Sequence, residues 1–173
     1  ASNSVPAGNV ANGATNVSLG AFEFDVKGEA VSWAQIALTI ATSSGGSGTA
    51  GNKGITNVTI VNQNGSVIAG PQDPNAAGST VTIADTVTLQ TGKHILVVKG
   101  NLDNDWTAND TIQVSFTPSS ALSTVRGQTS GNTLTPSPSS AVSGLTQTVK
   151  SGALTVTPAS SLASQNIIAG STN

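Results

Sequence analysis

Apolar and polar residues alternate with a period of two near the start of the chain, which is the pattern of β-strands with one buried face. Val17 and Leu19 share one face, and after Gly20 the apolar positions resume as Phe22 and Phe24 with the opposite parity. A slip of one residue sends every later side chain to the other face. The switch therefore predicts a β-bulge or a strand that passes from one sheet to another.

A second switch of parity follows within the next apolar block. Val31 and Trp33 lie on one face, whereas Ile36 and Leu38 lie on the other, with Ala34 and Gln35 between the two pairs. Two neighbouring strands that both change face indicate two sheets packed against each other. The position of Trp33 within an apolar strand favours a place for this ring in the core.

Further strands are expected wherever β-branched residues gather between turn residues. Asn62 to Gly65 forms an Asn-Gly hairpin signal, because these residues tolerate the positive φ of tight turns. The other expected strand segments are residues 55–61, 66–69, 81–89, 95–99, 112–116, 123–126, 146–150 and 154–156. No segment has a clear 3.6-residue apolar period, so the fold class is predicted to be all-β, a two-sheet antiparallel sandwich of immunoglobulin-like or jelly-roll type with terminal strands or linkers.

The end of the sequence repeats its beginning. Residues 163–170 (Ala-Ser-Gln-Asn-Ile-Ile-Ala-Gly) align with residues 1–8 (Ala-Ser-Asn-Ser-Val-Pro-Ala-Gly), and residues 171–173 then match residues 14–16. Such a period indicates a domain-sized unit of an array. We therefore expect an N-terminal strand or linker over 1–14, a β-sandwich domain over 15–157, and a C-terminal linker or donor strand over 158–173.

Composition narrows the classes of partner. Only 8% of the 173 residues are charged, the net charge is −2, and the six basic residues are scattered singly, which disfavours a nucleic-acid surface. No apolar run reaches the roughly 20 residues of a membrane span, which argues against direct membrane insertion. Cysteine and methionine are both absent, so oxidants have no sulfur to attack. An extracellular, cell-surface location suits this composition.

Residues 101–110 contain three of the eight acidic residues. Asp103, Asp105 and Asp110 could supply several of the oxygen ligands that calcium needs. Their spacing does not match an EF-hand, and Asp and Asn also dominate ordinary turns without any metal. Calcium is the one candidate cofactor, and an Asx turn is the alternative.

Two other features bear on ligands and catalysis. Trp106 lies in the same polar loop and is the better of the two tryptophans as a ligand contact, such as a platform for a glycan. His94 is the only histidine, and no Gly-x-Ser-x-Gly elbow presents a nucleophile to it. We therefore expect a protein that is not an enzyme.

Two longer motifs resemble the immunoglobulin-like β-sandwich repeats of large tandem-repeat bacterial cell-surface proteins of the kind found in candidate-phyla lineages. The opening motif spans residues 12–24 (Asn-Gly-Ala-Thr-Asn-Val-Ser-Leu-Gly-Ala-Phe-Glu-Phe), and the closing motif spans residues 148–156 (Thr-Val-Lys-Ser-Gly-Ala-Leu-Thr-Val). The resemblance implies a structural repeat without catalytic residues.

The leading functional hypothesis is a non-enzymatic structural subunit or repeat of an extracellular fibre, surface layer or stalk. Open sheet edges invite pairing between copies, and the matching ends could be interchangeable strands. The partners would be identical copies or adjacent repeats, with Val5, Ala7, Ile167 and Ile168 as the assembly strand. The alternative is an adhesin or carbohydrate-binding module displayed on the cell surface, and a spacer within a larger surface enzyme is a third class.

Overall fold

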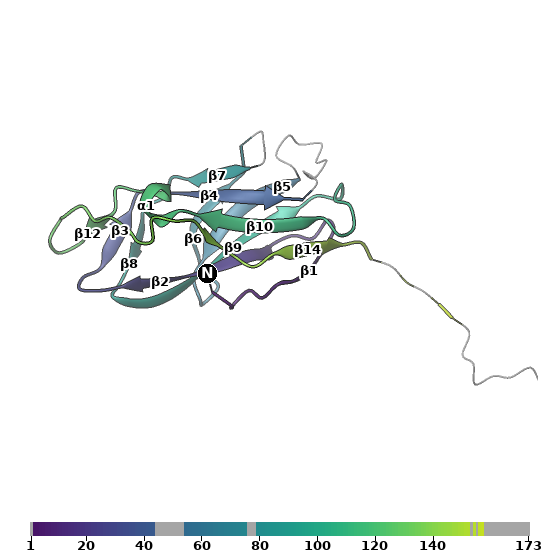
Figure 1. Cartoon of the computed structure of the whole chain (residues 1–173), viewed down its shortest axis with the longest axis horizontal. Coiled ribbons are helices and arrows are strands. Elements are labelled where there is room, and N and C mark those ends of the chain that lie inside the picture. The colour runs from purple at the N-terminus through teal and green to yellow at the C-terminus, as the bar shows by residue number, and fades with distance from the viewer. Residues whose placement is uncertain (1, 44–53, 76–78, 153, 155, 158–173) are drawn as a thin grey trace, which may run out of the picture.

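The computed structural model describes residues 2–43, 54–75, 79–152, 154 and 156–157, and these form an almost entirely β domain (Figure 1). Fourteen strands and one short helix are present in the described part of the chain. The strands are β1 (Gly8–Ala11), β2 (Val17–Val26), β3 (Val31–Trp33), β4 (Gln35–Thr42), β5 (Ile55–Val61), β6 (Val67–Gln72), β7 (Thr80–Ile83), β8 (Val87–Leu89), β9 (Gly92–Leu102), β10 (Thr111–Phe116), β11 (Leu122–Ser123), β12 (Arg126–Gly127), β13 (Val142–Ser143) and β14 (Gln147–Lys150). The helix α1 spans Pro118–Ala121.

One layer is a four-stranded antiparallel sheet in the order β2-β9-β5-β6. The bulge expected near Gly20 is confirmed, because the register between β2 and β9 shifts between Ser18 and Gly20. The bulge lets Leu19 and Phe22 both be buried although they lie three residues apart in one strand. The hairpin at Asn62 to Gly65 is also confirmed: Gly65 N donates to Asn62 O, and its φ is +81°.

The second layer is a seven-stranded sheet with the path β1-β14-β10-β4-β11, in which β13 also pairs with β10 and β7 with β4. A three-stranded sheet, β12-β3-β8, continues it. The central strand β4 lies between β7 and β11, and the preceding strand β3 lies between β8 and β12. Three adjacent segments of the chain therefore pass from one sheet to the other at the same level. Ala34 makes the break in one of them, and Thr124, at φ +53°, helps to make it in another. The second parity switch thus marks a real change of sheet.

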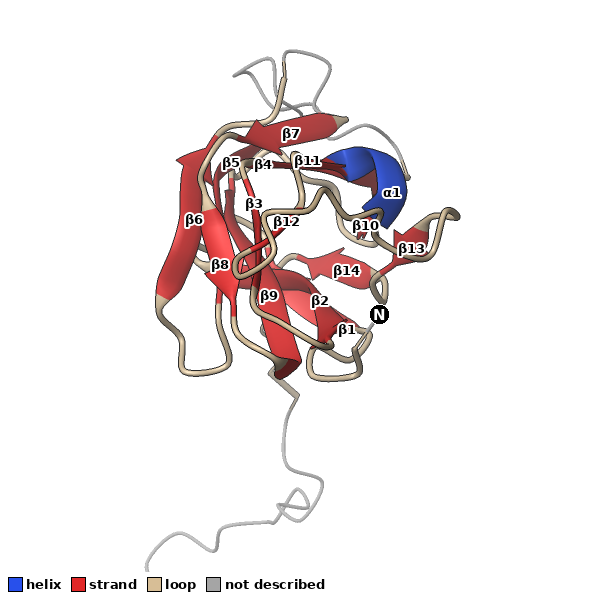
Figure 2. Ribbon diagram, turned by 90° about the vertical axis from the view of Figure 1, so that its left-hand side faces the viewer, coloured by secondary structure: helices blue, strands red, loops and turns tan. Residues whose placement is uncertain are grey.

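The apolar faces of these sheets form one continuous core. Its largest fully buried side chains include Trp33, Leu19, Leu38, Ile60 and Ile112. Trp33 is therefore a core residue, as its sequence context predicts. Viewed along the strands, the sheets enclose this core as a sandwich (Figure 2).

Three expectations about elements need correction. Leu154 and Val156 do not form a last strand, and they are 90% and 82% exposed. The strand after the hairpin, expected over residues 66–69, continues three residues further to Gln72. The pairing is not antiparallel throughout: among the described strands, β1 and β14 pair in parallel. Because β1 and β14 come from opposite ends of the domain, no local pattern could have predicted their relative direction.

Candidate functional site

The first residues of the chain connect the open edges of the two layers. Ser2 N donates a 2.9 Å hydrogen bond to Ala21 O on β2, which is the edge strand of the four-stranded sheet. A few residues later, β1 pairs with β14 at the edge of the seven-stranded sheet. The N-terminal segment, which we define as residues 2–11, therefore closes the seam between the layers. We call the surface that it covers the N-terminal slot.

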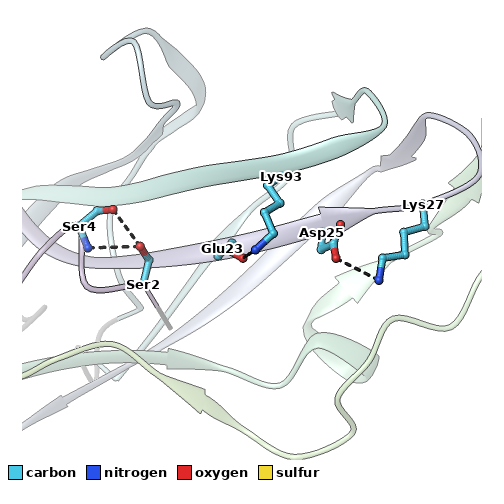
Figure 3. A network of polar contacts seen from close by, with 6 residues as sticks. All are labelled: Ser2, Ser4, Glu23, Asp25, Lys27 and Lys93. Carbon is cyan, nitrogen blue, oxygen red and sulfur yellow. Dashed lines mark hydrogen bonds and ion pairs between the residues drawn. The ribbon is translucent and has the colours of Figure 1, made fainter.

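Buried and polar contacts fix this segment in the slot. Ser2 and Val5 are only 9% and 8% exposed, and the Ser2 hydroxyl lies 2.9 Å from the Ser4 hydroxyl (Figure 3). Gln147 is buried on β14, and its Nε2 donates to Pro6 O at 3.0 Å. The buried side chains of Ser2 and Val5 fit into the slot, whereas Pro6 contributes its backbone carbonyl group.

The residues predicted to form the assembly strand differ in burial. Val5 is buried, but Ala7 and Pro6 are exposed, and the strand begins only at Gly8. Ile167 and Ile168 lie outside the described residues. In the sequence alignment of the two ends, Ile167 matches the buried Val5 and Ile168 matches the exposed Pro6.

Next to the slot, the edge of β2 is open. Because Ala21 O faces outward to Ser2, strand alternation also turns the backbone groups of Glu23 and Asp25 outward, away from β9. Within the described residues, no backbone group bonds to the outward side of these two positions. Glu23 and Asp25 place charged side chains on the solvent face, where they pair with Lys93 and Lys27 at 2.7 and 3.1 Å (Figure 3).

An apolar groove of about 460 Å³ opens between this edge and the chain around residues 134–142. Four of the five aromatic residues of the protein line it. They are Phe22, Phe24, Trp33 and Phe116. Leu134, Pro136, Pro138 and Val142 form the facing wall.

The aromatic rings of the groove stack against one another. Phe24 is stacked on Trp33 and on Phe116, with ring centroids 5.6 and 5.8 Å apart, and Phe22 meets Phe116 edge-on at 4.9 Å. Phe24 remains partly exposed in the described structure, whereas the other three rings are buried. The sequence pattern placed Phe22 and Phe24 on one face of a strand, but it did not predict this groove.

The acidic loop is held by its own turns. Asp103 Oδ1 accepts a 3.0 Å hydrogen bond from Asp105 N, and Asp110 Oδ2 accepts one of 3.0 Å from Thr107 N. No set of three or more histidine, cysteine or acidic side chains in the described part of the chain is arranged to hold a metal ion. Asp103 and Asp110 thus each cap a turn with one carboxylate oxygen.

Trp106 does not offer its ring to solvent. It is 3% exposed and belongs to the hydrophobic core, and its Nε1 donates a 3.1 Å hydrogen bond to Gly54 O. The polar residues around it in the sequence suggested an accessible ring, which is wrong for this structure. The loop folds inward at this position because the indole both fills the core and satisfies a carbonyl group.

One carboxylate outside the groove has a clear structural task. Glu29 accepts hydrogen bonds from Ser130 Oγ at 2.6 Å and from the backbone N–H groups of Ser130 and Thr129 at 2.8 and 2.6 Å. These bonds, the Ser130 hydroxyl first, lower the pKa of Glu29 below its ordinary value of 4.5. On the solvent face of the four-stranded sheet, the hydrogen bond from Lys93 to Glu23 raises the pKa of Lys93.

Comparison of the chain with protein families, with curated proteins and with solved structures found no match. No helix in the described ranges is long and apolar enough to span a bilayer.

Proposed function

We propose that this protein is a non-enzymatic structural module that joins copies of itself end to end, as part of an extracellular fibre, surface layer or stalk. In this proposal the C-terminal segment of one copy, residues 163–170, occupies the N-terminal slot of the next copy. Main-chain hydrogen bonds supply the affinity, and the side chains that enter the slot supply the specificity.

The observation that supports this proposal is the pattern of matches between the two ends. Two of the three buried positions of the N-terminal segment, Ser2 and Val5, recur in the tail as Ser164 and Ile167, one identical and one similar. Gly8, where β1 begins, recurs as Gly170, whereas the buried Val10 has no aligned counterpart. A segment that keeps the first buried positions of another is suited to replace that part of it, which is the basis of strand exchange between copies.

The proposed contact joins two different surfaces, the C-terminal segment of one copy and the N-terminal slot of the next. Such a contact is heterologous, and it builds open filaments or rings depending on whether the rotation closes.

The composition supports the proposed location. The absence of cysteine and methionine leaves no sulfur for oxidants to attack in an extracellular setting. A resemblance to bacterial surface repeats is consistent with the same setting. The described residues give no support to the glycan-binding alternative, because Trp106, its best candidate residue, is buried.

Assembly of the full chain, measured by sedimentation velocity and electron microscopy, tests the proposal. Deleting residues 159–173 should abolish assembly while the thermal unfolding transition of the sandwich is retained. Ile167→Asp should also abolish it, because a carboxylate would enter the site of Val5, which is 8% exposed. Ile168→Asp is the matched control and should assemble, since it corresponds to the exposed Pro6. A full chain that stays monomeric, or an Ile167→Asp variant that assembles as well as the control, would refute the proposal.

A further inference from the structure

The open edge of β2 is bounded at both ends. At one end, Ala21 O already accepts the hydrogen bond from Ser2 N. At the other end, β2 stops at Val26, and the chain bends at Gly28, where φ is +83°. The backbone hydrogen bonds of the described residues include no other on the outward side of this stretch. A strand that pairs with the edge is therefore confined to the short stretch between Ala21 and Gly28.

The side chains on the solvent face of this stretch carry charges of both signs. Glu23, Asp25 and Lys27 follow one another at alternate positions, and all three are exposed. Within one copy, Lys93 pairs with Glu23, and Lys27 pairs with Asp25 (Figure 3). Two acidic positions followed by a basic one allow an antiparallel copy of the same edge to place opposite charges against each other.

We propose that this edge pairs with the same edge of a second copy, antiparallel and about a two-fold axis at Asp25, so that the two four-stranded sheets form one continuous sheet. In this register Glu23 of each copy lies opposite Lys27 of the other, which gives two cross-strand ion pairs. The outward N–H and C=O groups of the two Asp25 residues bond to each other at the centre. This edge is a different surface from the N-terminal slot, so the contact goes beyond the proposed function and does not depend on it.

The charges select this register. Charged side chains on an edge strand ordinarily prevent pairing between copies, but they can also disfavour every register except one. A shift by two residues toward the start of β2 sets Glu23 opposite Asp25 twice, and like charges directly opposite are destabilising. A shift the other way sets Glu23 opposite the chain beyond the bend at Gly28. The two Asp25 carboxylates that meet on the axis each have Lys27 of their own copy at 3.1 Å.

The inner face of the same stretch is apolar and borders the aromatic groove. Phe24 is partly exposed, whereas Val26 is 8% exposed. In the proposed register Phe24 of each copy lies opposite Val26 of the other, and aromatic and β-branched residues form stabilising cross-strand pairs. The contact therefore covers the exposed part of the ring that stacks on Trp33 and Phe116.

Disulfide trapping in the full chain tests the register, and the absence of cysteine means that a crosslink reports only the introduced residue. Asp25→Cys should form a covalent dimer under mild oxidation, because hydrogen-bonded antiparallel partners have Cα atoms about 5.5 Å apart, within the range of a disulfide. Lys93→Cys is the matched control, since position 93 is exposed on the same face and lies opposite Asp25 in the register of β2 and β9. In the proposed dimer the two copies of position 93 are three strand spacings, about 14 Å, apart. An Asp25→Cys dimer yield no higher than that of Lys93→Cys overturns the inference.

An exchange of charges gives an independent measurement. Lys27→Glu makes both ends of the edge acidic and Glu23→Lys makes both ends basic, so each variant alone sets like charges opposite each other. A mixture of the two variants restores both opposite-charge pairs. In the Ile167→Asp background, which removes the end-to-end contact, sedimentation velocity should show the mixture to associate at least about tenfold more tightly in Kd than either variant alone. A mixture that associates no more tightly than the single variants contradicts the inference.

Variants of the tail separate this contact from the end-to-end contact. Ile167→Asp should leave the Asp25→Cys crosslink unchanged even where it abolishes end-to-end assembly, and a crosslink lost in this background makes the edge inference wrong. Deleting residues 159–173 should also leave the crosslink unchanged. If the yield rises instead, the tail of the same copy occupies the edge in the full chain, and the second copy is excluded as its partner. Circular dichroism and thermal unfolding of each variant show that the sandwich is folded.

Discussion

Replacing Trp106 by alanine is expected to destabilise the fold severely, because the ring is a core element. A tryptophan side chain buries about 150–250 Å². At about 25 cal/mol per Å² this area corresponds to about 4–6 kcal/mol of hydrophobic stabilisation. Measured truncations of buried aromatic residues cost about 3–5 kcal/mol. We therefore expect Trp106→Ala to lower the free energy of unfolding by about 4 kcal/mol. This is a large part of the unfolding free energy of a typical domain, which is about 5–15 kcal/mol.

Trp106→Phe separates packing from hydrogen bonding. Phenylalanine keeps much of the apolar surface but leaves Gly54 O without the indole donor that lies 3.1 Å away. The expected loss is about 1–3 kcal/mol, the cost of a buried acceptor without its partner.

Urea denaturation followed by far-ultraviolet circular dichroism measures both variants. For a domain of this size, a loss of about 4 kcal/mol lowers the melting temperature by about 8–16 °C. A Trp106→Ala variant within about 1 kcal/mol of the original protein would refute the reasoning, because surface substitutions have effects of about that size or less. It would also restore Trp106 as a candidate for an exposed ligand contact.

Three further predictions follow from particular contacts. The pKa of Glu29 is lowered in the folded state, so the hydrogen bonds to its carboxylate stabilise the fold at pH values above the ordinary pKa of 4.5, and this stabilisation is lost as the pH falls through the lowered pKa. Glu29→Gln should therefore show a shallower loss of thermal stability in that acidic range. Identical pH profiles of the two proteins would contradict this. Gly54→Ala should lower the melting temperature more than Gly65→Ala, because both glycines have positive φ but a Cβ at position 54 would lie 2.5 Å from Asp103 Oδ1, whereas position 65 is open; equal shifts would be the contrary result. Deleting residues 1–7 should strengthen assembly in sedimentation experiments, since the tail of a second copy would no longer compete with an intramolecular occupant of the slot; weaker assembly would argue against exchange.

The local pattern of the sequence predicted much of the fold. The switch of parity at Gly20 became a bulge, and the switch at Ala34 became a passage between sheets, because strand alternation records which face each side chain must bury. The Asn62–Gly65 hairpin followed from turn chemistry alone. By contrast, Leu154 and Val156 alternate like a strand but have no partner among the described strands, and pairing cannot be inferred from one segment.

The sequence by itself determined that this protein is a sulfur-free, weakly charged β domain whose two ends match. Only the tertiary structure decided what each matching position does: it buried Val5, exposed Pro6, turned Trp106 into the core and left the edge of β2 open beside four aromatic rings. The physical reason is that burial and edge pairing depend on contacts between residues far apart in the chain. Ser2 meets Ala21 and Pro6 meets Gln147, and neither contact leaves a periodic trace in the sequence.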